Sequence, residues 1–229
     1  MYTYLVPLKK EFEQNRDEAL AVRMKQYMKG QYTYFGIPSP LRRDILREFL
    51  KVYGLPKVDD INMITKDCWD QPEREFQYFI MEILGKMARR AEPDRIDLYE
   101  YISVNKSWWD TIDYIASNLV GVHFQKYPEQ IKPQTEKWMD SENMWLQRIS
   151  LLFQLKYKAK TDVELMSRYI ERLLGSKEFF INKAIGWILR EYSKTNAEWV
   201  LNYVNENKNL LSGLSYREAL KWLDRKGKI

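Results

Sequence analysis

Ser107-Trp108-Trp109-Asp110-Thr111-Ile112-Asp113 is the stretch that predicts the fold of this chain, because related segments recur at regular intervals. In each copy an aromatic or apolar residue is followed, about one helical turn later, by a charged residue. The other copies begin at Trp69, Trp145, Phe180 and, more weakly, Leu214. The charged positions are, in chain order, Arg74, Asp113, Arg148, Lys183 and Arg217, with steps of 39, 35, 35 and 34 residues.

Steps of this length predict an all-α superhelical solenoid of HEAT-like (armadillo-like) two-helix repeats. One repeat cannot bury its apolar face alone, so neighbours share a core and equivalent positions line up on one concave surface. Bases in such a row suit a long polyanion. The alternative is a chance alignment, since 37 Lys and Arg among 229 residues offer many coincidences.

Helical periodicity dominates the chain, and strand patterns are nearly absent. The connections are short, and no Ser/Gly linker or low-complexity tract divides the sequence, so one HEAT-like domain over residues 1–229 is expected. Helices are predicted at residues 5–12, 19–28, 41–52, 72–89, 95–102, 108–125, 129–140, 143–158, 162–174, 178–193, 197–206 and 214–226.

Composition excludes several classes of protein. The single cysteine, Cys68, rules out an internal disulfide, and the single histidine, His123, argues against a His/Cys metal site. No apolar run approaches the roughly 18 residues of a membrane span, and no secretory signal is apparent. We therefore expect a cytoplasmic, metal-free protein that does not span a membrane.

Positive charge is concentrated in the C-terminal part. Residues 141–229 carry 16 bases and 10 acids, whereas residues 1–140 carry 21 bases and 22 acids. This asymmetry indicates a nucleic acid or an acidic membrane surface as partner. The alternative, which composition supports equally, is a basic face that is exposed to solvent and binds no partner.

Asp113 is the residue with the clearest chemical meaning. The chain has no Gly-rich phosphate loop, no Ser-His-Asp set and no His-Glu-x-x-His motif. Trp109 and Asp113 are four residues apart and therefore share one helix face. A carboxylate among bases repels phosphates, so two interpretations remain open. In the first interpretation, Asp113 pairs with a base of the next repeat, such as Arg148, and its role is structural. In the second, Asp113 meets a positive charge that appears on the nucleic acid.

Glycosidic bond cleavage supplies such a charge. As the bond between sugar and base stretches, the sugar becomes oxocarbenium-like, and an adjacent carboxylate stabilises it and can orient the attacking water. Indole faces also favour a neighbouring cation. Trp109 and Trp187 could flank the sugar together with Asp113. For Trp187, which lies four residues after Lys183, core filling is the alternative.

Several blocks of the sequence resemble the DNA alkylation-repair glycosylases of the AlkD type, over nearly the full length. The blocks are Tyr27-Met28-Lys29, Phe35-Gly36-Ile37, Pro40 with Arg42-Arg43, Trp69-Asp70 with Pro72-Glu73-Arg74-Glu75-Phe76, Lys106-Ser107-Trp108-Trp109-Asp110 with Asp113, Trp145-Leu146-Gln147-Arg148 with Leu155-Lys156-Tyr157-Lys158, and Ser176-Lys177-Glu178-Phe179-Phe180-Ile181 followed by Lys183-Ala184-Ile185-Gly186-Trp187 and Arg190-Glu191-Tyr192.

The resemblance implies a HEAT-like solenoid whose concave basic face binds double-stranded DNA. Members of that family excise N3- and N7-alkylpurines, such as 3-methyladenine and 7-methylguanine, in base excision repair. They act as monofunctional glycosylases, without a metal or cofactor and without flipping the base. By resemblance, Asp113 is the catalytic carboxylate, Trp109 and Trp187 contact the lesion sugar, and Arg148 and Tyr27 face DNA.

The alkylated bases that such enzymes remove carry a formal positive charge. They are good leaving groups already, so a single carboxylate suffices and no general acid is required. We choose further residues as candidates for the DNA groove and expect a monomer. These candidates are Lys156, Lys158, Lys183, Arg190 and Lys194.

Two other functions remain compatible with the sequence. Helical-repeat proteins mostly bind and rarely catalyse, so a non-catalytic reader of unusual DNA or RNA structure is the main alternative. A protein–protein scaffold that uses the nearly neutral N-terminal part is compatible with both. Convergence of Asp113, Trp109 and Trp187 on one point favours the enzyme, and their placement on opposite faces excludes it.

Overall fold

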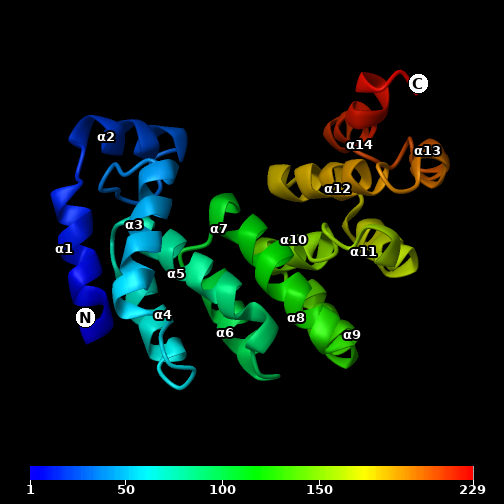
Figure 1. The fold of residues 1–229 in the computed structure, drawn as a ribbon. Helices are drawn as coiled ribbons and strands as arrows, with labels where there is room; N and C mark the ends of the chain where they lie inside the picture. Colours follow the sequence, from blue (N-terminus) through cyan, green and yellow to red (C-terminus); the bar gives the residue numbers. More distant parts are fainter. Residues whose placement is uncertain (229) are drawn as a thin grey trace. The chain divides into compact units, whose positions relative to one another are not determined.

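The computed structural model describes residues 1–228, and the regular elements in that range are helices (Figure 1). Extended pairing within residues 1–228 is limited to one isolated bridge between Thr33 and Glu73. Within the same range, no helix has both the length and the apolar character that crossing a membrane requires. The predicted all-α class is confirmed.

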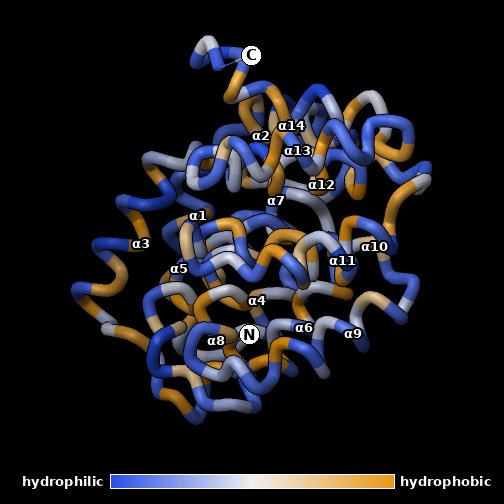
Figure 2. The backbone as a smooth tube through the Cα atoms, turned by 90° about the vertical axis from the view of Figure 1, so that its right-hand side faces the viewer, coloured by the Kyte–Doolittle hydropathy of each residue, from blue (hydrophilic) through white to orange (hydrophobic). Residues whose placement is uncertain are grey.

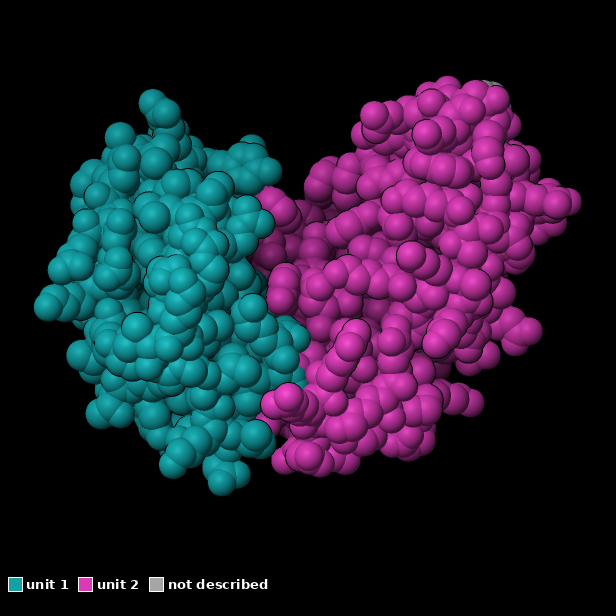
Figure 3. Space-filling model, in the orientation of Figure 1, with its two compact units in different colours: residues 1–87 teal, residues 88–229 magenta. Residues whose placement is uncertain are grey.

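The chain forms two compact units, Met1–Met87 and Ala88–Ile229, which Figure 3 colours separately. Hydrophilic and hydrophobic stretches alternate along the helices (Figure 2), as expected where each helix buries one face. The prediction of a single domain over residues 1–229 stays a prediction.

The first unit has a phenylalanine-rich core. The rings of Phe12 and Phe76 lie with their centroids 5.2 Å apart, and those of Phe12 and Phe35 lie 5.6 Å apart. The helices of this unit are η1 (Thr3–Leu5), α1 (Val6–Gln14), α2 (Glu18–Tyr27), α3 (Ser39–Tyr53), α4 (Ile61–Asp70) and α5 (Arg74–Met87).

Arg74 does not fit the expected row of phosphate-binding cations. Its side chain is fully buried, and its guanidinium lies 4.0 Å from the centre of the Tyr32 ring. A cation held inside the first unit in this way is a structural element of the core. The expectation that Arg74 contributes a cation to the phosphate-binding row is therefore wrong.

The second unit contains the remaining helices and the candidate site. The segments α7, η3 and α8 follow one another without a break, and η3 is a π-helix. The elements are η2 (Ala88–Arg90), α6 (Arg95–Val104), α7 (Trp109–Tyr114), η3 (Ile115–Val120), α8 (Gly121–Lys126), η4 (Pro128–Gln130), α9 (Ile131–Asp140), α10 (Met144–Leu152), η5 (Lys158–Lys160), α11 (Val163–Leu173), α12 (Phe179–Tyr192), α13 (Ala197–Glu206) and α14 (Gly213–Arg225).

Contacts in the second unit join residues that are one predicted repeat apart. The hydroxyl of Tyr157 donates to the carbonyl of Gly121, 36 residues earlier, at 2.7 Å. The Thr135 and Tyr169 hydroxyls lie 2.6 Å apart across 34 residues. Helix α10 packs on α7 and η3, α12 packs on α10, and α14 packs on α12. Such constant separations are what stacked helix pairs produce, and they support the repeat alignment.

Two expectations about the helices were wrong. Helix α4 was missed, although Ile61, Ile64, Cys68 and Trp69 give it a buried face at helical spacing. The helix expected at 143–158 ends as α10 at Leu152, because the chain turns there before η5. The helix expected at 108–125 is confirmed as the continuous run of α7, η3 and α8, and its π segment is an addition that no propensity rule signals.

Candidate active site

A pocket of about 320 Å³ lies in the second unit, where α7, α10 and α12 meet. Aromatic rings and charged groups line it together. The lining residues are Trp109, Asp113, Arg148, Phe179, Phe180, Lys183, Trp187 and Arg190. The three residues proposed as catalytic, Trp109, Asp113 and Trp187, thus lie around one cavity.

Helix α7 brings Trp109 and Asp113 to the pocket. The chain arrives in an extended conformation at Trp108, with φ −157° and ψ 161°, and the helix begins at Trp109. Asp110 in the first turn suits the positive end of the helix dipole. Asp113 follows Trp109 by four residues, so both side chains project from the same face.

Helix α10 supplies Arg148. Its N-terminus is capped by Asn143, whose side-chain oxygen accepts hydrogen bonds from the backbone amides of Trp145 at 2.9 Å and Leu146 at 3.3 Å. An Asn cap of this type fixes where the helix starts and therefore which residues face its neighbours. Arg148 lies one turn further on and is 2% exposed.

Helix α12 supplies the other wall. Lys183, Trp187 and Arg190 are spaced by four and three residues, so they form a stripe along one face of the helix. The side-chain amide of Asn182 donates to the carbonyl of Ser176 at 2.8 Å and fastens the start of the helix to the preceding loop. All three residues of the stripe line the pocket.

Asp113 and Arg148 form a two-pronged ion pair. Nε of Arg148 donates to Oδ1 of Asp113 at 2.8 Å, and Nη2 donates to Oδ2 at 3.0 Å. The third nitrogen, Nη1, donates to the carbonyl of Phe180. Arg148 therefore ties α7 and α12 together through α10. Arg148 is thus the partner that the structural interpretation of Asp113 predicted.

The pair does not seal Asp113 off from the pocket. Its side chain keeps 19% of its surface exposed, whereas that of Arg148 keeps 3%. Burial raises the pKa of Asp113, and the charge and hydrogen bonds of Arg148 act against that rise. Asp113 can therefore be structural toward Arg148 and still present carboxylate surface to a ligand.

An aromatic cluster lies beside the pocket and contains the aligned aromatic residues of three repeats. The rings of Trp108 and Trp145 lie 5.8 Å apart, those of Trp145 and Phe180 lie 5.1 Å apart, and those of Trp108 and Phe180 lie 5.3 Å apart. Such packing gives α7, α10 and α12 a common rigid base. Phe179 lines the pocket with 58% of its surface exposed.

The sequence alignment placed Arg217 opposite Lys183, and the structure corrects this. Arg217 is exposed, and the residue that meets Lys183 is Glu218, with Nζ and Oε1 2.7 Å apart. The step from Lys183 to Glu218 is 35 residues, the same as from Asp113 to Arg148. The aligned positions therefore form acid–base pairs between neighbouring repeats, and Asp113 is not the only acid among them.

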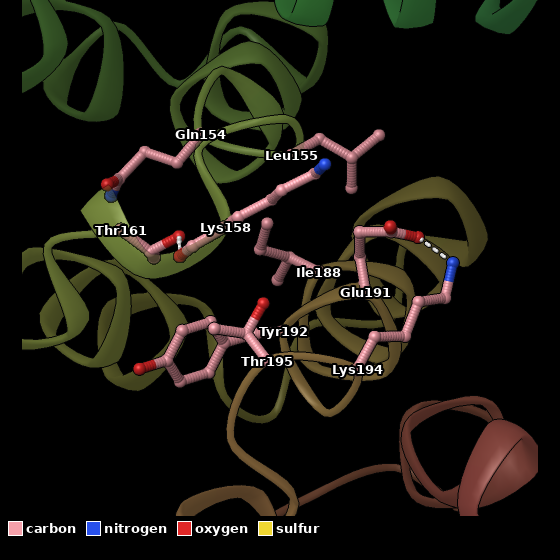
Figure 4. Close-up of a pocket in the computed structure, with 9 residues that line it drawn as sticks. All are labelled: Gln154, Leu155, Lys158, Thr161, Ile188, Glu191, Tyr192, Lys194 and Thr195. Carbon is pink, nitrogen blue, oxygen red and sulfur yellow. Dashed lines mark hydrogen bonds and ion pairs between the residues drawn. The ribbon is translucent and has the colours of Figure 1, made fainter.

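Two of the other predicted DNA-binding lysines border a second pocket, of about 270 Å³. Figure 4 shows Lys158 and Lys194 there, together with Glu191, which holds Nζ of Lys194 at 2.5 Å. Lys156 lies elsewhere and donates to Oδ1 of Asn118 in η3 at 2.5 Å. Tyr27 ends α2 in the first unit and is 71% exposed.

The sequence did not indicate Phe179 or Glu218 as residues of the site, and it indicated Phe180 only as the aromatic residue of its repeat. An exposed aromatic such as Phe179 carries no periodic signal, and a signal for Glu218 existed only in the exact 35-residue step. In the described range, no group of three or more His, Cys, Asp or Glu side chains is placed to hold a metal ion.

Comparison with known proteins gives one consistent result. A family model described as "DNA alkylation repair enzyme" matches residues 8–223. A solved structure described as a predicted DNA alkylation repair enzyme from Enterococcus faecalis is 30% identical in sequence. The similarity covers 91% of this chain and 96% of that one, with a TM-score of 0.84. No curated protein matches the chain.

Proposed function

The chain belongs to the DNA alkylation repair enzyme family, and from this premise we propose that it is a monofunctional DNA glycosylase of base excision repair. Its substrates are N3- and N7-alkylpurines such as 3-methyladenine and 7-methylguanine in duplex DNA. The observation that carries the proposal is the arrangement of Trp109, Asp113 and Trp187 around one pocket.

The reaction breaks the bond between C1′ of deoxyribose and the purine nitrogen. The bonding electrons go to the base, which leaves neutral because alkylation had made it cationic. Water then adds to C1′ and loses a proton. Among the lining residues in the described part of the chain, Asp113 alone carries a carboxylate. It stabilises the oxocarbenium-like sugar and orients the water.

Trp109 and Trp187 stand on different helices of the same pocket. Indole faces attract cationic centres with about 0.5–2 kcal/mol each. We assign both residues to the lesion sugar, where their faces add to the effect of Asp113. Rings fixed by the helices on either side need little reorganisation as charge develops.

The surrounding cations are assigned to DNA phosphates. Lys183 and Arg190 line the candidate pocket, Lys158 and Lys194 border the second pocket, and Lys156 belongs to the same unit. Arg148, whose guanidinium is bonded to Asp113 and Phe180, reaches a phosphate only when one of these bonds opens. Tyr27 is the candidate DNA contact of the first unit. A superhelical HEAT-like solenoid with a concave basic face that binds DNA as a monomer, without base flipping, belongs to this proposal. The one-repeat contact separations support it.

The decisive experiment measures release of 7-methylguanine and 3-methyladenine from methylated duplex DNA. We expect Asp113→Asn to lower the rate by about 100-fold or more, the loss typical of removing a preorganised electrostatic group. Asp140→Asn is the matched control, because Asp140 also pairs with an arginine, Arg172 at 2.5 Å, but lines neither pocket. It should keep the wild-type rate.

A non-catalytic nucleic-acid-binding protein is the second candidate. The observation in its favour is the two-pronged pair with Arg148, which gives Asp113 a structural role that needs no chemistry. The two functions differ in one measurement. A wild-type protein that binds methylated duplex DNA but releases no base contradicts the glycosylase proposal and supports this one.

A further inference from the structure

Glu218 of α14 holds the two cations that line the candidate site from α12. Its Oε1 lies 2.7 Å from Nζ of Lys183, and its Oε2 lies 2.5 Å from Nη1 of Arg190. Lys221, on the same helix as Glu218, approaches Oε1 to 3.7 Å. The carboxylate itself is only 10% exposed and is not among the lining residues.

The position of Glu218 follows from a close approach of two helices. A Cβ added to Gly186 would meet Cβ of Glu218 at 2.5 Å and the carbonyl oxygen of Ser215 at 2.8 Å, so a larger residue would push α14 away. The hydroxyl of Ser215 also donates to the carbonyl of Asn182 at 2.8 Å. Gly186 stands between Lys183 and Arg190, one turn from each, and this centres Glu218 between them.

Glu218 changes the charge that the pocket offers to DNA. Asp113 and Arg148 cancel each other, and Lys183 and Arg190 add two positive charges, of which Glu218 offsets one. Burial opposes ionisation of Glu218, but the hydrogen bond and charge of Lys183, with the charges of Arg190 and Lys221, outweigh it. Its pKa is therefore lowered, and Glu218 is a carboxylate at neutral pH.

We propose that Glu218 is a specificity-determining residue that occupies Lys183 and Arg190 in place of DNA phosphates and so limits binding of undamaged duplex at the pocket. Non-specific binding depends on how many phosphates the protein neutralises. A cation already paired with a buried carboxylate contributes little to that number, because a phosphate must first displace its partner. The proposal rests on the DNA-binding part of the proposed function.

The test compares Glu218→Gln with Glu136→Gln on undamaged duplex DNA over a range of salt concentrations. Glu136 is the matched control, because it also pairs with a base, Arg172 at 2.7 Å, but lines neither pocket. Both variants gain one unit of net charge. For Glu218→Gln we expect tighter binding and a salt slope steeper by about 0.9–1.8, which corresponds to one or two additional phosphates. Glu136→Gln should keep the wild-type slope.

Equal slopes for the two variants would overturn the proposal, whether or not the protein releases bases. The reverse outcome, a steeper slope without base release by the wild type, leaves the role of Glu218 standing and removes only the glycosylase. Should Glu218→Gln not fold, Arg190→Gln and Lys156→Gln give the answer. Among residues 1–228, the hydrogen-bond partner found for Nζ of Lys156 is the neutral side-chain amide of Asn118. Lys156→Gln should therefore lower the slope more than Arg190→Gln does, and equal losses overturn the proposal.

Discussion

Replacing Arg148 by Met tests whether the ion pair with Asp113 stabilises the second unit. The substitution keeps an unbranched apolar side chain but removes the guanidinium that bonds both oxygens of Asp113 and the carbonyl of Phe180. Removing one partner of a buried ion pair costs about 3–5 kcal/mol. Because the Asp113 side chain is 19% exposed, the lower end, about 3 kcal/mol, is expected at pH 7.

Protonation of Asp113 limits this loss in a way that depends on pH. Without Arg148, the pKa of Asp113 rises further, so the native state favours the neutral acid. Neutralising an aspartate of unfolded pKa about 3.9 costs about 4.2 kcal/mol at pH 7 but only about 1.5 kcal/mol at pH 5. At pH 5 the unpaired Asp113 can therefore destabilise Arg148→Met by at most about 1.5 kcal/mol, and this maximum grows as the pH rises.

The measurement is urea unfolding of wild type, Arg148→Met, Asp113→Asn and the double variant at pH 5 and pH 7, followed by tryptophan fluorescence. Of the eight tryptophans, all but Trp69 lie in the second unit, so the signal reports mainly on that unit. The double variant should be more stable than Arg148→Met at pH 7, because no charge is stranded. A pH-independent loss, or a double variant no more stable than the single, would refute the reasoning.

Three further results are expected. Gly186→Ala should destabilise the protein by about 1–3 kcal/mol, because the added methyl group overpacks the contact with α14, and urea unfolding measures this loss. Gly54→Ala is not a suitable control, because Gly54 has φ +68° and any side chain there is strained. Base release should fall on the acid side with a midpoint above that of an ordinary aspartate, because burial raises the pKa of Asp113, and Arg148→Gln should move that midpoint to higher pH. Lys156→Ala should lower the salt slope of duplex binding by about 1 while leaving unfolding unchanged, and a slope equal to that of wild type would remove Lys156 from the interface.

Local spacing predicted which side chains of the site lie on the same helix face, and the structure places them around one pocket. Four residues separate Trp109 from Asp113 and Lys183 from Trp187, and a helix fixes the relative direction of such pairs whatever surrounds them. The 35-residue step also brought Asp113 to Arg148. These features depend on one helix or on one repeat interface, and both are encoded nearby in the sequence.

Errors arose where the outcome depends on what packs around a residue. Arg74 is fully buried, and its guanidinium lies against the ring of Tyr32, which is distant in the sequence. Arg217 was chosen because it is a base like its aligned neighbours, yet the packing at Gly186 determines the register of α14 and turns Glu218 inward. A charged residue therefore has to be assigned by the partner that it meets and not by the sign of its aligned counterparts.

The π-helical turn at Ile115–Val120 determines how this segment of the chain can change in length and in sequence. It lies directly between Asp113 and Gly121, where a Cβ would collide with the backbone carbonyl of Phe153. A π-helical turn holds one residue more than an α-helical turn, so loss of one codon here would restore an ordinary helix whose two ends keep nearly their present directions. Substitutions meet a stricter limit, because Ile115, Ala116, Leu119 and Val120 are fully buried. The segment therefore accepts the loss of one residue more readily than a change in its buried side chains.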